Sequence, residues 1–78
     1  MAILRLFAAA REAAGTGSAT IEATTVADVL AAAAERYGPA FAEVLGTCKV
    51  WLNGDETSPS AAVGPTDEVA VLPPVSGG

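Results

Sequence analysis

Apolar and polar residues alternate at both ends of the chain, and this period of two predicts a β-strand at each end. The last strand is Glu68–Leu72, with Val69 and Val71 on the inner face, and Pro73-Pro74 ends it because proline cannot donate to a strand ladder. The first strand is Ala2–Ala8. Its inner face carries Leu4, Leu6 and Ala8, and its outer face carries Ile3, Arg5 and Phe7. We expect these two strands to lie side by side at the centre of a sheet.

Two further strands are predicted between them. The turn residues Gly15–Ser18 precede an alternating segment, Ala19–Ala23, so the first two strands form a hairpin with a long loop. Cys48–Asn53 is the next strand, with Val50 and Leu52 on one face and Lys49 and Trp51 on the other. Asn53-Gly54-Asp55 is a strong turn signal, which leads into a short edge segment.

A helix of about three turns is predicted from Val26 to Tyr37, because apolar residues recur there at helical spacing. Thr25 followed by Asp28 resembles a capping box with aspartate in place of glutamate. Gly38-Pro39 ends the helix, and residues 40–45 add one more turn. The fold class is therefore α+β, a mixed sheet of four to five strands packed on one main helix.

Composition limits both the size of the protein and its chemistry. The 78 residues make one domain, 1–78, and contain a single cysteine and no histidine. This excludes an intramolecular disulfide, a zinc site with cysteine and histidine ligands, and histidine-based acid–base catalysis. The net charge of −5, with four scattered cations, argues against nucleic acid. It either favours a basic protein partner or only keeps a small domain in solution. Neither a membrane span nor a signal peptide is expected, and the lone thiol fits a reduced, cytoplasmic setting.

The chain ends in Gly77-Gly78, and this ending carries the candidate chemistry. Glycine lacks a Cβ, so a terminal glycine pair passes through a channel too narrow for other dipeptides and presents its α-carboxylate there. We expect residues 73–78 to form an exposed, flexible tail, which spans at most about 20 Å when extended. Pro73 and Pro74 either stiffen this tail or merely end the last strand.

The order of elements and three sequence segments resemble the ubiquitin-like β-grasp sulfur carriers of the MoaD and ThiS family. The most specific segment is Asp67–Gly78 (DEVAVLPPVSGG), and the others are Leu6–Gly15 and Val50–Gly54. Within the family the closest resemblance is to the small subunit of molybdopterin synthase, because the thiamine-pathway carriers typically lack the proline pair.

The resemblance implies that Gly78 is a substrate for other proteins and that this chain has no active site of its own. A ubiquitin-activating-type adenylyltransferase would use ATP to form an acyl-adenylate at Gly78, and a sulfur donor protein would convert it to a thiocarboxylate. The tail would then enter the large subunit of molybdopterin synthase, in a heterotetramer, and deliver sulfur to a pterin precursor of the molybdenum cofactor. No bound cofactor or metal is expected.

Partner-binding residues follow from the same resemblance and from the outward face of the strands. They are Phe7, Leu72, Pro73, Pro74, Val75 and Ser76, with Phe7 and Leu72 forming an exposed apolar patch near Ile3. For Trp51 two interpretations stay open, an interface anchor or a side chain packed under residues 58–64. Cys48 is interpreted as a small buried hydrophobe, Arg11 as a residue that fixes the first turn, and Asp67-Glu68 as solvated turn charges.

Alternative functions within the same fold also remain. The chain could carry sulfur for thiamine, cysteine or transfer-RNA thiolation. It could instead be a ubiquitin-like modifier joined to lysines of other proteins through Gly78, or an interaction domain with an inert tail.

Overall fold

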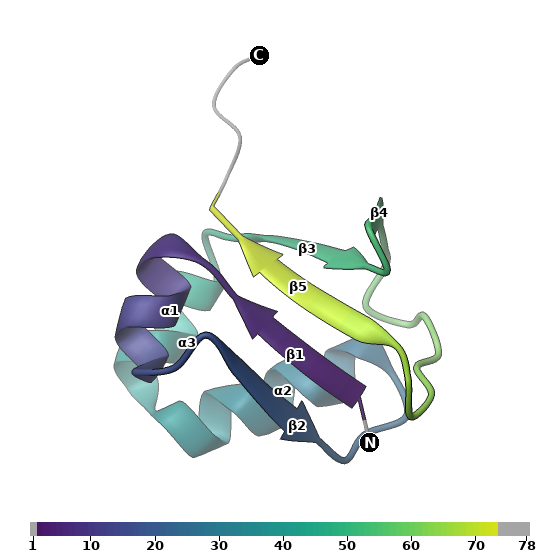
Figure 1. Ribbon diagram of the computed structural model, residues 1–78. Coiled ribbons are helices and arrows are strands. Elements are labelled where there is room, and N and C mark those ends of the chain that lie inside the picture. Colours follow the sequence, from purple (N-terminus) through teal and green to yellow (C-terminus); the bar gives the residue numbers. More distant parts are fainter. Residues whose placement is uncertain (1, 74–78) are drawn as a thin grey trace.

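The first and last strands lie side by side in the middle of one sheet, as predicted (Figure 1). The computed structural model describes residues 2–73. In that range β1 (Ala2–Leu6) runs parallel to β5 (Glu68–Leu72), and β2 (Ser18–Ile21) is antiparallel to β1. On the other side, β3 (Lys49–Leu52) is antiparallel to β5, and β4 (Asp55–Glu56) forms the far edge. The order β2-β1-β5-β3-β4 confirms the mixed sheet.

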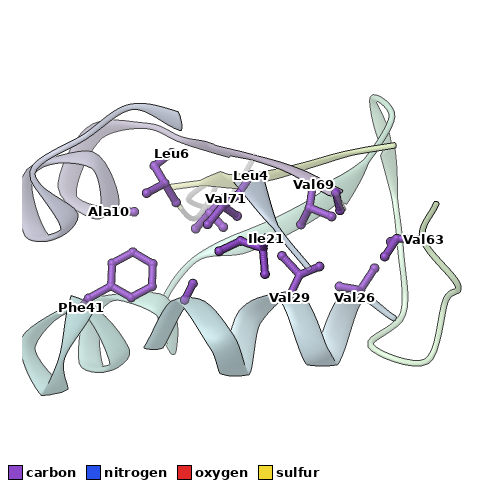
Figure 2. Close-up of a cluster of buried hydrophobic side chains, with 12 residues drawn as sticks. Leu4, Leu6, Ala10, Ile21, Val26, Val29, Phe41, Val63, Val69 and Val71 are labelled. Carbon is purple, nitrogen blue, oxygen red and sulfur yellow. The ribbon is translucent and has the colours of Figure 1, made fainter. Parts of the chain in front are cut away.

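The hydrophobic core lies between this sheet and the helices on one of its faces (Figure 2). Strand residues alternate as the sequence indicates: Leu4, Leu6, Val69 and Val71 are buried, whereas Ile3 and Phe7 are exposed. The helices contribute the opposite side of the core. Their buried side chains are Ala10, Val26, Val29, Ala33 and Phe41.

Helix α2 (Val26–Tyr37) confirms the main helix, and all four N–H groups of its first turn have acceptors. Asp28 N–H donates to the Thr25 hydroxyl at 3.1 Å, as the capping pattern predicts, and Val29 N–H donates to the Thr25 carbonyl at 3.0 Å. The other two donate to loop carbonyls, Val26 N–H to Ala61 at 2.9 Å and Ala27 N–H to Pro59 at 2.8 Å. The loop before β5 is thereby fixed against the start of α2.

A short helix, α1 (Ala8–Ala14), replaces part of the loop expected between the first two strands. The expectation that the first strand reaches Ala8, with that residue inward, is wrong: β1 ends at Leu6, and Ala8 is exposed with φ of 50°. The sequence of α1 is mostly alanine and shows almost no apolar periodicity, which is why the helix was not predicted. Only Ala10 of this helix is buried. Gly15 ends the helix with φ of 79°, a value that favours glycine.

The chain turns at Gly38, whose φ is 93°, and α3 (Pro39–Leu45) extends the turn predicted there to seven residues. Phe41 of α3 is fully buried, and its ring meets Tyr37 edge-on at a centroid distance of 5.2 Å. The sheet is thus covered by α1, α2 and α3 rather than by one helix alone.

The remaining strand boundaries differ from the predictions by a few residues. β2 begins at Ser18 and ends at Ile21, before the predicted end at Ala23, and β3 is shortened at both ends. Asn53 and Gly54 have φ of 52° and 88°, so they form the two-residue turn with both angles positive that joins β3 to β4. The short edge segment predicted after this turn is confirmed as β4.

Candidate functional site

The candidate site is built on the face of the sheet opposite the helices, here called the open face (Figure 1). Side chains alternate along each strand, so the residues paired with outward residues also point outward. Arg5 lies opposite Ala70, which lies opposite Trp51 of β3. Lys49 lies opposite Leu72.

Phe7 and Leu72, predicted as an apolar patch, are neighbours on this face. Ile3 lies opposite Glu68, and its N–H donates to the carbonyl of the preceding residue, Asp67. Phe7 N–H donates in the same way, at 3.2 Å, to the carbonyl of Val71, which is the residue before Leu72. Phe7 therefore lies opposite Leu72. Phe7 is 42% exposed and Leu72 is half-buried, so the pair offers apolar surface beside the end of β5.

Ile3 is the second large apolar side chain that the described residues leave exposed, at 37%. It lies on the same face of β1, but Arg5 separates it from Phe7. Ile3 and the Phe7–Leu72 pair therefore flank a charged residue instead of forming one continuous apolar surface.

Arg5 forms an ion pair with Glu68 across the two central strands, with 3.2 Å between Nε and Oε2. Sequence reasoning did not identify this pair and treated Glu68 as a solvated charge. The signal was nevertheless present, because both residues are outward on strands expected to be adjacent. Only the register, with Ile3 opposite Glu68, shows that their side chains meet diagonally.

Trp51 also points to the open face, because its neighbours Val50 and Leu52 lie opposite the buried Val71 and Val69. It is half-buried and does not belong to the side chains that pack on the core. Of the two interpretations left open, its position on the sheet fits an interface anchor.

Asp67 remains accessible to solvent, but it is more than a solvated turn charge because its carboxylate has specific partners. Its carboxylate accepts the Gly64 N–H at 2.7 Å and the Asn53 side-chain amide at 3.0 Å, and Asn53 in turn accepts the Glu68 N–H at 2.9 Å. The Gly64 bond first, and the Asn53 bond second, lower the pKa of Asp67 below its ordinary value of 3.8. This network fixes the loop that leads into β5.

Cys48 and Arg11 have local structural contacts. The Cys48 thiol donates to the Val44 carbonyl at 3.2 Å, and the half-buried side chain packs against the core, consistent with a small hydrophobe. The Arg11 side chain covers Gly17, where an added Cβ would lie 3.4 Å from its Nε. Arg11 thus contacts the connection between α1 and β2, as the turn-fixing interpretation expects.

The chain leaves the sheet at the end of a central strand, where Leu72 is followed by the exposed Pro73. Pro74, Val75, Ser76, Gly77 and Gly78 lie outside the described residues, so the roles assigned to them stay predictions. Within residues 2–73 there is no cluster of histidine, cysteine or acidic side chains suited to a metal ion. The helices of the same range are too short or too polar to cross a membrane.

Comparison with known proteins adds a family and a set of similar folds. Residues 4–78 match the model of the ThiS family. The crystal structure of SAMP1 from Haloferax volcanii is 32% identical with a TM-score of 0.83, and the match covers 99% of this chain and 98% of that one. The solution structure of the small archaeal modifier protein 1 from Methanosarcina acetivorans is 30% identical with a TM-score of 0.87, covering 99% and 95%.

A third solved structure shows the same fold at lower identity. It is the complex of subunits 1 and 2 of the molybdopterin-converting factor from Helicobacter pylori, 24% identical with a TM-score of 0.74, covering 99% of this chain and 97% of that one. At this identity the match supports the β-grasp fold alone, and the function is inferred from the family and the sequence.

Proposed function

Because this chain belongs to the ThiS family of ubiquitin-like sulfur carriers and modifiers, we propose that the carboxyl group of Gly78 is its reacting group. The observation that carries the proposal is the position of β5. This strand lies at the centre of the sheet and leads the chain out beside the Phe7–Leu72 pair, so a partner that grips the open face also receives the tail. Residues 2–73 then provide the surface that is bound by enzymes that act on Gly78.

The chemistry divides into two steps. A free carboxylate is a poor acyl donor because its leaving group is oxide, so ATP first converts Gly78 to an acyl-adenylate with release of pyrophosphate. A sulfur donor protein then supplies a sulfide equivalent that attacks the acyl carbon and displaces AMP. The product is a thiocarboxylate, which holds a nucleophilic sulfur on a portable protein.

We further propose that this sulfur enters molybdenum cofactor biosynthesis, with the chain as the small subunit of molybdopterin synthase. Its ending, with Pro73-Pro74 ahead of Gly77-Gly78, supports this pathway over thiamine synthesis. The Helicobacter pylori protein of the same fold forms a complex with a second subunit of the converting factor. The partners here would be a large synthase subunit, an adenylyltransferase of the ubiquitin-activating type and the sulfur donor.

A second function is favoured by a specific observation. Two solved structures at 30% identity or above are small archaeal modifier proteins. Attack on the same acyl-adenylate, or on a thioester made from it, by a lysine amine would give an isopeptide bond and make this chain a modifier. Both functions share the activation of Gly78 and differ only in the nucleophile that follows.

Intact mass spectrometry tests the proposal. The protein is incubated with ATP, a sulfur source and the adenylyltransferase of its own organism. Conversion of the Gly78 carboxylate, through the acyl-adenylate, to a thiocarboxylate exchanges one oxygen for sulfur. The intact mass of the protein therefore rises by about 16 Da. A variant that lacks Gly77-Gly78 keeps every described residue and is the matched control, for which no mass change is expected.

The outcomes separate the two functions. The molybdopterin pathway is supported if the mass gain occurs and the added sulfur is transferred to a pterin precursor only when the large synthase subunit is present. Heavier adducts with other proteins, lost in the truncated control, support the modifier. A wild-type mass that never changes overturns the activation of Gly78 itself.

A further inference from the structure

The centre of the open face carries two opposite charges that already neutralise each other. Arg5 and Glu68 are joined at 3.2 Å, and their side chains are 52% and 43% exposed. A solvent-exposed ion pair of this kind contributes little to folding, because water screens it and both side chains lose freedom. The small contribution of the pair to the stability of the free protein therefore does not explain why it lies at the middle of the sheet.

The neighbours of the pair are apolar. Ile3 in β1 and Phe7 just after it flank Arg5, and along β5, Ala70 and Leu72 follow Glu68. The other charged residues that the strand register places on this face are Lys49 and Glu56, both on the β3–β4 side. Over β1 and β5, the described residues thus form a surface that is apolar except for one internally compensated pair.

We propose that the Arg5–Glu68 pair selects the docking partner. The protein that activates Gly78 covers β1 and β5 with an apolar surface that carries no charge opposite the pair, and the pair becomes buried intact. This inference rests on the proposed function, since it concerns the enzyme that acts on the tail, and it adds the chemistry of that enzyme's contact surface.

Charge complementarity favours such an occupant. A carboxylate placed opposite Arg5 by the partner would also approach Glu68, and a cation placed opposite Glu68 would approach Arg5, so each attraction brings a repulsion. An uncharged apolar surface meets no such conflict and buries Ile3 and Phe7. A second copy of this chain is a poorer occupant, because each copy carries a net charge of −5.

The physical consequence is an asymmetry between free and bound protein. Removing one charge of an exposed pair changes folding little, whereas removing one charge of a buried pair leaves the other without a partner in a desolvated contact. Removing both charges together leaves an apolar surface that still fits the partner. The two single variants and the double variant therefore respond differently in binding and similarly in folding.

The experiment measures ATP–pyrophosphate exchange by the organism's own adenylyltransferase, with the concentration of this protein varied. Arg5→Leu and Glu68→Leu are each expected to raise the KM for this protein about tenfold or more with kcat unchanged. The double variant R5L/E68L is expected to return KM to within about threefold of wild type. Glu35→Gln on the exposed surface of α2 is the control for loss of one negative charge and should leave KM unchanged.

Two further measurements exclude trivial explanations. The thermal midpoints of the single variants should stay within about 3 °C of wild type, because the pair is exposed in the free protein. Size-exclusion chromatography with light scattering should show monomers for all variants.

If the wild-type protein supports ATP–pyrophosphate exchange, the proposed function stands, and three outcomes would still overturn the inference about the ion pair. KM unchanged in both single variants means that the pair is not covered. A double variant weaker than either single variant means that the partner supplies counter-charges. Wild-type dimers whose dissociation follows mutation of Arg5 or Glu68 mean that the face is occupied by a second copy. Absence of any exchange with the wild type counts against the proposed function instead.

Discussion

At the scale of single residues, the side chains around the start of β5 are tied to one another by specific hydrogen bonds. Asp67 receives donors from Gly64 and Asn53, and its carbonyl accepts the Ile3 N–H at 2.9 Å. One acidic residue thus connects the loop before β5, the turn after β3 and the first strand. The ionised carboxylate of Asp67 accepts the bonds from Gly64 and Asn53, so the contribution of Asp67 to stability depends on pH.

We predict that Asp67→Asn lowers the thermal midpoint at pH 7. The folded-state pKa of Asp67 lies below its ordinary 3.8, so its stabilising effect is present above that value and is lost as pH falls through the folded-state pKa. The difference in midpoint between wild type and variant should therefore narrow as pH falls below 3.8 and through the folded-state pKa. Circular dichroism melts from pH 7 downward measure it. A difference that is constant over this range would show that the charge of Asp67 is not responsible.

Ala8 shows a second residue-scale feature that no sequence pattern indicates. Its φ of 50° lies in the left-handed region, which is unfavourable for any residue with a Cβ. β1 ends at Leu6, and this conformation, directly after Phe7, turns the chain into α1. The exposed Phe7 ring thus lies at a sharp change of direction.

At the scale of elements, α2 combines a local signal with a distant one. The Thr25 hydroxyl caps the helix from within its own sequence neighbourhood, whereas Pro59 and Ala61 provide carbonyls from more than thirty residues away. The first part was predictable because capping depends on residues three apart. The second part was not, because no short-range pattern marks a carbonyl as an acceptor.

Thr25→Ala is predicted to destabilise the protein by about 1 kcal/mol, since the Asp28 N–H loses its acceptor while the loop carbonyls remain. Urea unfolding followed by circular dichroism gives the free energy of unfolding. Thr25→Ser retains the hydroxyl and is the matched control, with most of the stability preserved. Equal losses in the two variants would mean that the methyl group of Thr25, and not the cap, stabilises the helix.

At the scale of the whole molecule, the two faces of the sheet have separate tasks. One face builds the core with the helices, and the other presents Phe7, Leu72 and Trp51 to solvent. The two phenylalanines of the chain divide between these tasks. Phe41 is fully buried, whereas Phe7 is 42% exposed.

These two phenylalanines provide a matched pair of substitutions. Phe41→Ala is predicted to cost about 3–5 kcal/mol by leaving a cavity, a large share of the roughly 4–12 kcal/mol expected for a 78-residue domain. Phe7→Ala is predicted to change the free energy of unfolding by less than about 0.5 kcal/mol and to weaken partner binding instead. Urea unfolding and the exchange assay measure both effects. A Phe7 variant that unfolds as readily as the Phe41 variant would contradict this division.

The amino-acid sequence by itself determined the features that depend on near neighbours. Alternation placed Phe7 and Leu72 on one outward face, capping and periodicity located α2, and Asn53-Gly54 marked its turn. Gly77-Gly78 was noticed from the sequence alone, and its reactivity stays a prediction because both residues lie outside the described range.

Only the tertiary structure decided the contacts between distant segments. Arg5 and Glu68 are 63 residues apart and meet because the parallel register of β1 and β5 aligns them. Helix α1 and the burial of Phe41 likewise arise from packing, since a seven-residue helix is too short to form without tertiary contacts. Local energies bias each segment, whereas the pairing of strands and the filling of the core depend on the whole chain at once.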